Sequence, residues 1–88
     1  MKQYTKLIKT LMGCYNQAAK GKGKERHANN QPFEEQPIMW IEKYFHSYQL
    51  GQAVKKIDES QRLPPQLAIE EIKGAVIYLC AHIITLEK

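Results

Sequence analysis

The longest and most apolar segment of the chain follows Pro64 and Pro65 and reads QLAIEEIKGAVIYLCAHIITLEK (66–88). The proline pair keeps Leu63 out of the helical region, and Pro65 suits the first position of a helix. One apolar stripe at the helical period consists of Ile72, Val76, Leu79, Ile83 and Leu86, and a second row consists of Ile69, Ile77, Cys80 and Ile84. These rows cover more than half of the helix circumference. Such a helix is either central to its own bundle or pressed against another copy of the chain.

Three shorter helical segments precede it. The first, about residues 2–20, carries apolar residues at the helical period: Tyr4, Leu7, Ile8, Leu11, Tyr15 and Ala18. Gly21 and Gly23 end this segment, since glycine favours the position after a helix. Two further helices are expected at about 37–48, opened by Pro37, and at about 49–62. The sequence leaves open whether Gly51 separates these two helices or lies inside one long helix.

The pattern predicts an all-α fold. A chain of 88 residues is too short for two cores, so residues 1–88 are expected to form one domain. No stretch shows the alternation of a β-strand. We therefore predict a compact bundle of three to four helices with a long basic loop after the first. Because the shorter helices can hardly cover the last one, we also predict a homo-oligomer that associates through the last helix.

Composition limits where such a chain acts. The apolar fraction is 43%, which is ordinary for a globular domain, and no run approaches the roughly 18 apolar residues of a membrane span. The first residues lack the apolar stretch and cleavage site of a secretory signal. Cys14 and Cys80 fit no metal or redox spacing and are expected to be buried free thiols. These features predict a cytoplasmic protein with no membrane partner.

The net charge of +4 is concentrated in one loop. Residues 20–26, KGKGKER, hold four cations and one anion, whereas the rest of the chain is nearly neutral. A cluster of this kind favours a local anion site over a surface that follows a nucleic-acid duplex. The alternative is a solvated, cation-rich connection between two helices. The length of the aperiodic stretch, about residues 21–36, favours a functional loop.

The loop contains residue types that suit a phosphorylated, ring-bearing small molecule. Its glycines would present backbone N–H groups, its cations would hold phosphate, and its histidine could donate a hydrogen bond. An asparagine could contact a base or sugar edge, and a phenylalanine could stack on a ring. The predicted ligand-binding residues of this loop are Gly21, Lys22, Gly23, Lys24, Arg26, His27, Asn29 and Phe33.

A second group of candidates lies on the third helix. Lys55, Lys56, Glu59 and Arg62 are spaced so that they share one side of the helix. Either they form a salt-bridged, solvated face, or they complete the anion pocket, with Glu59 steering the cations or accepting a hydrogen bond from a base.

Catalytic and metal-binding patterns are weak. All-α nucleotide pyrophosphatases hold magnesium with a Glu-Glu-x-x-Glu set, but neither Glu34-Glu35 nor Glu70-Glu71 is followed by a third acid at that spacing. The three histidines are far apart, and no serine or cysteine has an adjacent base. We therefore predict a protein without catalytic residues, metal or cofactor.

Four blocks of the sequence resemble, in their order, a family of small and mostly uncharacterised phage and prophage proteins. They are GKGKERHA (21–28), PFEEQP (32–37), LGQAVKKIDESQRL (50–63) and EEIKGAVIYLCAHII (70–84). The third block also resembles the LGNAIKYI helix of phage-encoded domains linked to nucleotide metabolism, with Gln52 and Lys56 in place of Asn and Tyr. The resemblance implies a phage accessory protein in a bacterial cytoplasm.

Three binding functions follow from these observations. The first is a phage-type accessory protein, for example one that acts in counter-defence, that binds and sequesters a phosphorylated nucleotide-like ligand without catalysis. The second is an inhibitor that docks on a host or bacterial defence protein through the loop or the last helix. The third is a nucleic-acid binder, in which an oligomer aligns several basic loops.

Overall fold

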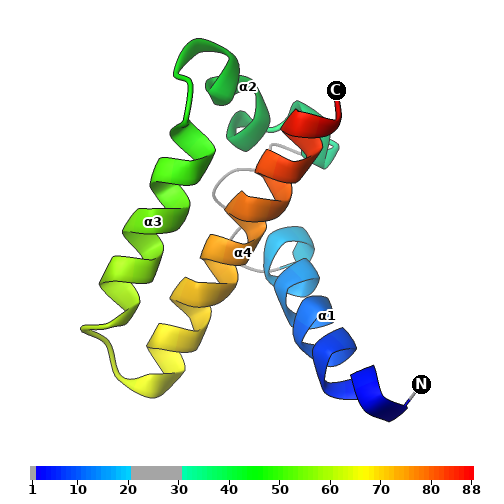
Figure 1. Cartoon of the computed structure of the whole chain (residues 1–88), viewed down its shortest axis with the longest axis vertical. Coiled ribbons are helices and arrows are strands. Elements are labelled where there is room, and N and C mark those ends of the chain that lie inside the picture. Colours follow the sequence, from blue (N-terminus) through cyan, green and yellow to red (C-terminus); the bar gives the residue numbers. More distant parts are fainter. Residues whose placement is uncertain (1, 21–30) are drawn as a thin grey trace.

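The computed structural model describes residues 2–20 and 31–88, and all of its regular structure is helical. The elements are η1 (Lys2–Tyr4), α1 (Thr5–Lys20), η3 (Phe33–Glu35), α2 (Pro37–Tyr44), α3 (Tyr48–Ser60) and α4 (Pro65–Glu87). α3 and α4 run side by side in opposite directions, α1 crosses α4, and α2 lies over the end of the hairpin where α4 finishes (Figure 1). The described residues thus confirm the predicted all-α class with four α-helices and no strand.

Small residues bring α3 and α4 close together. Ala53 of α3 and Ala75 of α4 are almost completely buried, and Gly74 lies beside the stem of Lys56. Small side chains on both helices let the two backbones approach each other closely, because the distance between packed helices depends on the side chains at the contact. The hairpin formed by α3 and α4 is therefore the central unit of the fold.

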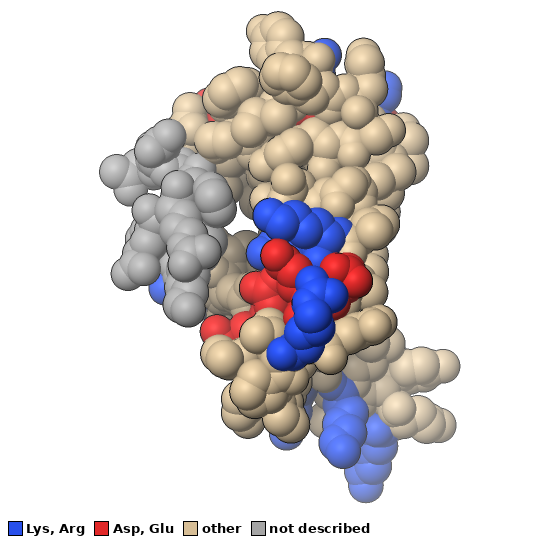
Figure 2. All heavy atoms as spheres, turned by 90° about the vertical axis from the view of Figure 1, so that its left-hand side faces the viewer, with Lys and Arg blue, Asp and Glu red and all other residues tan. Residues whose placement is uncertain are grey.

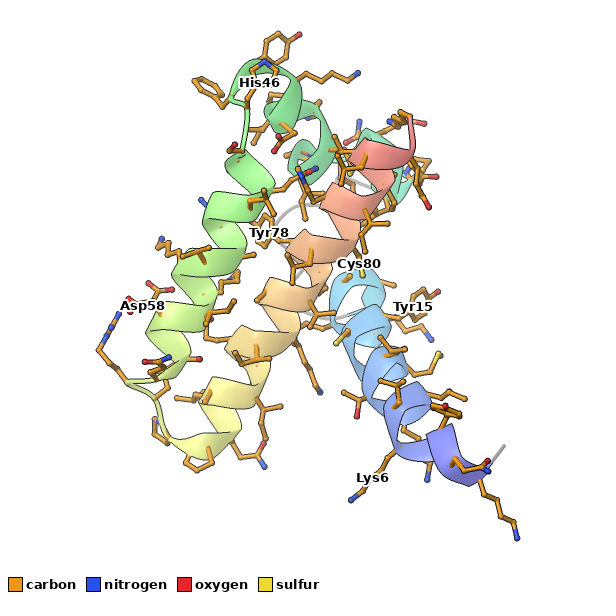
Figure 3. All side chains as sticks on the ribbon, in the orientation of Figure 1. Lys6, Tyr15, His46, Asp58, Tyr78 and Cys80 are labelled. Atoms are coloured by element: carbon orange, nitrogen blue, oxygen red, sulfur yellow. The ribbon has the colours of Figure 1, made fainter. Side chains whose placement is uncertain are left out.

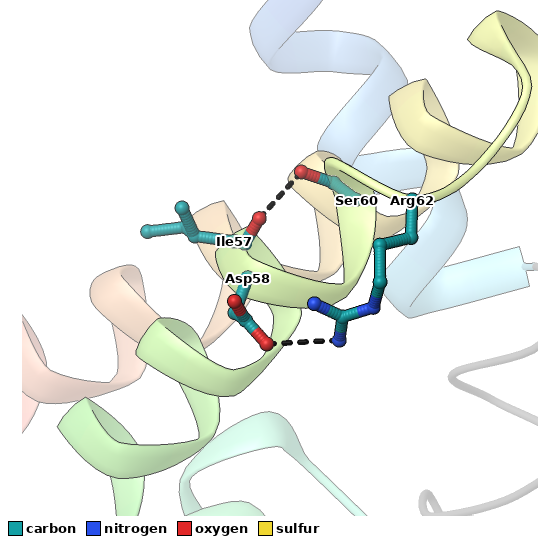
Figure 4. Close-up of polar contacts among 4 residues, drawn as sticks. All are labelled: Ile57, Asp58, Ser60 and Arg62. Atoms are coloured by element: carbon teal, nitrogen blue, oxygen red, sulfur yellow. Dashed lines mark hydrogen bonds and ion pairs between the residues drawn. The ribbon is translucent and has the colours of Figure 1, made fainter.

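The turn between α3 and α4 follows from residues at the end of α3. The Ser60 hydroxyl donates to the Ile57 carbonyl at 2.6 Å, and the Arg62 guanidinium donates to the Asp58 carboxylate at 2.8 Å (Figure 4). Pro64 has an extended backbone with ψ of 156°, and Pro65 occupies the first position of α4. The proline pair therefore ends one helix and starts the next, as expected.

The break between α2 and α3 lies earlier than the sequence suggested. The second helix was expected to reach residue 48, but α2 ends at Tyr44 and α3 begins at Tyr48. Ser47 takes a left-handed conformation, with φ of 69°, and this residue redirects the chain. Gly51 lies inside α3 and its N–H donates to the Ser47 carbonyl at 2.8 Å. Gly51 is thus tolerated within a helix and does not cause the break.

α1 is attached to α4 by its C-terminal half. Cys14 is buried as expected, whereas Cys80, also expected to be buried, is exposed. The Gln17 amide donates to the Glu70 carbonyl at 3.2 Å. Gly13 lies beside the Lys73 side chain, where an added Cβ would come within 3.2 Å of its Nζ. Residues 2–12 are all exposed, so the N-terminal half of α1 extends away from the rest of the molecule (Figure 1).

The apolar core of the described residues is small and lies at one end of the hairpin. Ile38, Met39 and Ala81 form its buried centre, and partly buried hydrophobic residues pack around it: Phe33, Ile77, Tyr78 and Ile84. Tyr78 also makes an edge-to-face contact with Tyr48 at 6.0 Å between ring centroids. Across residues 2–20 and 31–88, no helix combines the length and apolarity that crossing a membrane would need.

Candidate functional site

Most of the predicted ligand-binding loop lies outside the described residues. This is the case for Gly21, Lys22, Gly23, Lys24, Arg26, His27 and Asn29. Their role in binding phosphate therefore stays a prediction from the sequence.

Phe33 is described, and it lies in the core. Its ring is partly buried and packs against the cluster of Ile38, Met39 and Ala81. The Gln36 N–H donates to the Phe33 carbonyl at 3.1 Å, which shapes the short helix η3 before α2. The observed contacts of Phe33 anchor the segment that enters α2.

The predicted charged face on α3 carries both signs. Arg62 pairs with Asp58 at 2.8 Å, and Lys56 lies 3.9 Å from Glu71 of α4. The view onto the α3 side shows acidic and basic side chains mixed in one patch (Figure 2). The hydrogen bond and charge of Arg62 lower the pKa of Asp58, and those of Asp58 raise the pKa of Arg62. The geometry corresponds to a salt-bridged face.

The partner of Arg62 differs from the sequence interpretation. One of the two alternatives placed Arg62 in a salt-bridged face with Lys55, Lys56 and Glu59, but its hydrogen bond goes to Asp58, four residues before Arg62. Lys55 is exposed and Glu59 is half-buried. Among the described residues, Lys55, Lys56, Glu59 and Arg62 thus form no purely cationic pocket, and their binding of a ligand stays a prediction.

A buried carboxylate that the sequence analysis did not identify caps α3. The two Glu42 oxygens accept hydrogen bonds from the backbone N–H groups of Ser47 and Gln49, each at 2.8 Å. Burial would raise the pKa of Glu42, but these amide hydrogen bonds, with His82 and His46 nearby, hold its pKa below the usual value. The Ser47 side chain makes no capping hydrogen bond to α3. Glu42 takes over this role, and its negative charge is favourable at the first turn of a helix.

Gln49 connects α2, α3 and α4. This side chain is fully buried, and its Nε2 donates to the Ile38 carbonyl at 3.0 Å. Its Oε1 lies 3.0 Å from both the Thr85 hydroxyl and His82 Nδ1. Because an amide oxygen only accepts, His82 Nδ1 carries the hydrogen in this arrangement. Every polar group of Gln49 is thus used in holding the fold together.

A shallow cavity of about 190 Å³ opens beside this cluster. It is lined by Met39, Glu42, Lys43, His46, Thr85 and Lys88. The two backbone hydrogen bonds to Glu42 lower its pKa, which makes this carboxylate a weaker base. In the part of the chain that the structure describes, no three His, Cys, Asp or Glu side chains are grouped so as to hold a metal ion.

Exposed apolar side chains are the most extensive feature of the described surface. On η1 and α1 they form one row, Tyr4, Leu7, Ile8, Leu11 and Tyr15, with exposed fractions between 47% and 57%. We call these five residues the α1 row. Tyr15 projects away from the hairpin, whereas Lys6 projects from the opposite side of α1 (Figure 3). The periodicity of these residues predicts the helix, but it does not predict their exposure, which arises because the described chain has too few other helices to cover them.

Comparisons with protein-family models, with curated proteins and with solved structures find no match for this chain. Its function therefore has to be argued from its own residues and their geometry.

Proposed function

We propose that this chain is a non-catalytic binding protein that docks on another protein through the α1 row, as an inhibitor or accessory factor. The observation that carries the proposal is a row of large apolar side chains that α4 leaves exposed along a helix. The order of its sequence blocks supports a phage setting, so a host or bacterial defence protein is the proposed target.

The spacing of the α1 row suits insertion into a groove. Its residues follow one another at intervals of three, one, three and four, so they line one side of a helix. An amphipathic helix that lays such a row into an apolar groove is a recurring mode of protein recognition. The row includes two tyrosines, a residue type enriched among interface hot spots.

The charge of α1 indicates the chemistry of the partner. The segment 2–20 contains Lys2, Lys6, Lys9 and Lys20 and no acidic residue. A groove with an apolar floor and an acidic rim would complement this helix in both respects. The proposed target surface is therefore acidic, and association should be faster at low salt.

Site-specific photo-crosslinking in bacterial cells tests the proposal. A photoreactive phenylalanine analogue at Ile8 reports on the α1 row, and the same analogue at Lys9 is a matched control on the adjacent, polar side. We expect one discrete adduct from position 8 and none from position 9. Unlabelled wild-type protein should compete for this adduct, whereas the folded double variant Leu7→Asp/Leu11→Asp should not. Equal labelling from both positions, or equal competition by the variant, would contradict the proposal.

Sequestration of a phosphorylated nucleotide remains a second proposed function. It is favoured by the glycine-spaced cations of residues 21–26. Calorimetric titration with linear and cyclic nucleotides tests it, with Arg26→Ala as the variant that should lose at least tenfold in affinity. If short nucleic acids bind instead, with affinity falling steeply as salt rises, the nucleic-acid alternative is favoured.

A further inference from the structure

α4 carries a second exposed apolar row, and its spacing is that of a coiled coil. The row consists of Ile69, Ile72, Val76, Leu79, Ile83 and Leu86, at intervals of three, four, three, four and three. This is the heptad pattern of the a and d positions. The three a positions (69, 76, 83) are β-branched, and two of the three d positions are leucine, residue types that are usual at such interhelical contacts.

Neither neighbouring helix covers this row. α1 contacts α4 near Glu70 and Lys73, and α3 contacts α4 at Ala75 and around Tyr78, which lies between these two helices (Figure 3). Five of the six row residues remain exposed, from 40% for Leu79 to 73% for Leu86, and Val76 is half-buried. The row therefore lies on a side of α4 that neither α1 nor α3 covers.

α3 extends the same surface. Leu50, Val54 and Ile57 are exposed and follow one another at intervals of four and three. Viewed along the helix axis, these three residues lie to one side of Ala53, which faces α4. The row of α4 lies to one side of Ala75, and the direction of rotation along the chain is the same in both helices. Because the two helices are antiparallel, equal rotations place residues on the same side of the hairpin. We call these nine residues of α3 and α4 the hairpin face.

The surface area of the chain is larger than that of a typical monomer. A protein of 10.2 kDa is expected to expose about 5,300 Å², whereas this chain exposes 6719 Å². The excess of about 1,400 Å² is larger than the roughly 800 Å² that each partner buries in a standard interface. The chain therefore exposes enough additional surface for one standard interface.

We propose that a second copy of this chain covers the hairpin face, so that two α3–α4 hairpins related by a twofold axis form a four-helix bundle. The intervals of the α4 row read the same in both directions, so the row matches itself across a twofold axis. None of the nine residues is charged, so self-association brings no like charges into the centre of the interface. The α1 rows stay outside this interface, and the dimer presents two of them to a partner.

Analytical ultracentrifugation of the full chain from 1 to 100 µM tests the dimer. We expect wild type to sediment as a dimer and Leu79→Glu to raise the dissociation constant more than 100-fold, because each substitution occurs twice in the interface. Leu11→Glu, at a comparably exposed leucine of the α1 row, is the matched control and should remain dimeric. Circular dichroism checks that both variants are helical.

The wild-type protein provides a measurement that does not depend on the folding of a variant. The melting temperature of a dimer rises with protein concentration, whereas that of a monomer does not. A monomeric wild type with a constant melting temperature would overturn the proposal, as would dissociation by Leu11→Glu but not by Leu79→Glu. The dimer can be tested independently of the partner proposed for the α1 row. We expect Leu11→Glu to affect only the binding of that partner and Leu79→Glu to affect only the dimer.

Discussion

Replacing Glu42 by glutamine should test how strongly one carboxylate stabilises the start of α3. The native side chain accepts two backbone hydrogen bonds, from Ser47 and Gln49, each at 2.8 Å. Glutamine keeps one acceptor oxygen, but its NH₂ group faces the other backbone donor. Hydrogen bonds to a charged group contribute about 1.5–3 kcal/mol, so we expect the free energy of unfolding to fall by about 2 kcal/mol. For a chain of this size that corresponds to a melting temperature lower by about 8–16 °C.

The pH dependence separates the charge of Glu42 from its shape. The folded-state pKa of Glu42 is lowered, so its stabilisation is present above the unfolded pKa of about 4.3 and is lost as pH falls through the folded-state pKa. The difference between wild type and Glu42→Gln should therefore be largest near pH 7 and shrink towards pH 3.

Urea unfolding followed by circular dichroism at fixed protein concentration measures this difference at each pH. Glu35→Gln, at an exposed carboxylate of η3, is the control and should change stability by less than about 0.5 kcal/mol. A Glu42→Gln protein as stable as wild type at pH 7, or a difference that does not change with pH, would refute the reasoning.

Three further substitutions have expected signs, each measured by urea unfolding. Gly51→Ala should stabilise by about 0.5–1 kcal/mol, because a methyl group there would meet no described atom within 4 Å and alanine favours a helix interior. Ser47→Gly should stabilise by up to about 1 kcal/mol by relieving the left-handed backbone at φ of 69°, and a loss of stability would contradict this. Gln49→Leu should destabilise by about 1–3 kcal/mol, since the buried Ile38 carbonyl loses its donor and the half-buried His82 and Thr85 lose an acceptor, and an unchanged midpoint would argue against that network.

The helices could be predicted because their signals are local. The spacing of apolar residues and the Pro64-Pro65 pair gave α4 almost residue by residue, and Pro37 marked the first residue of α2. The end of α2 was wrong by four residues, because the break depends on Ser47 in a left-handed conformation, which glycine and asparagine favour more strongly than serine. Turn residues of that kind leave little trace in a single sequence.

The polar cluster could not be predicted, since it depends on contacts between distant residues. Gln49 meets Thr85 across 36 positions and His82 across 33. In the sequence, such a cluster is indicated only by a polar residue on an otherwise apolar side of a helix, and this residue does not identify its hydrogen-bond partners. The ion pair of Arg62 could not be predicted for a similar reason. Asp58 and Glu59 are both within reach on the same helix, and packing decides which of them forms the pair.

Cys14 is the one buried residue within Thr5–Lys20, and burial raises the pKa of its thiol. An alkylating reagent can therefore reach the sulfur only while α1 stands away from α4. The rate of iodoacetamide labelling at Cys14, divided by its rate in the urea-unfolded chain, measures how often the helix detaches. A partner that binds α1 more tightly when it is detached from α4 would speed this labelling, whereas a partner that contacts α1 and α4 together would slow it, so this native thiol reports how the partner binds.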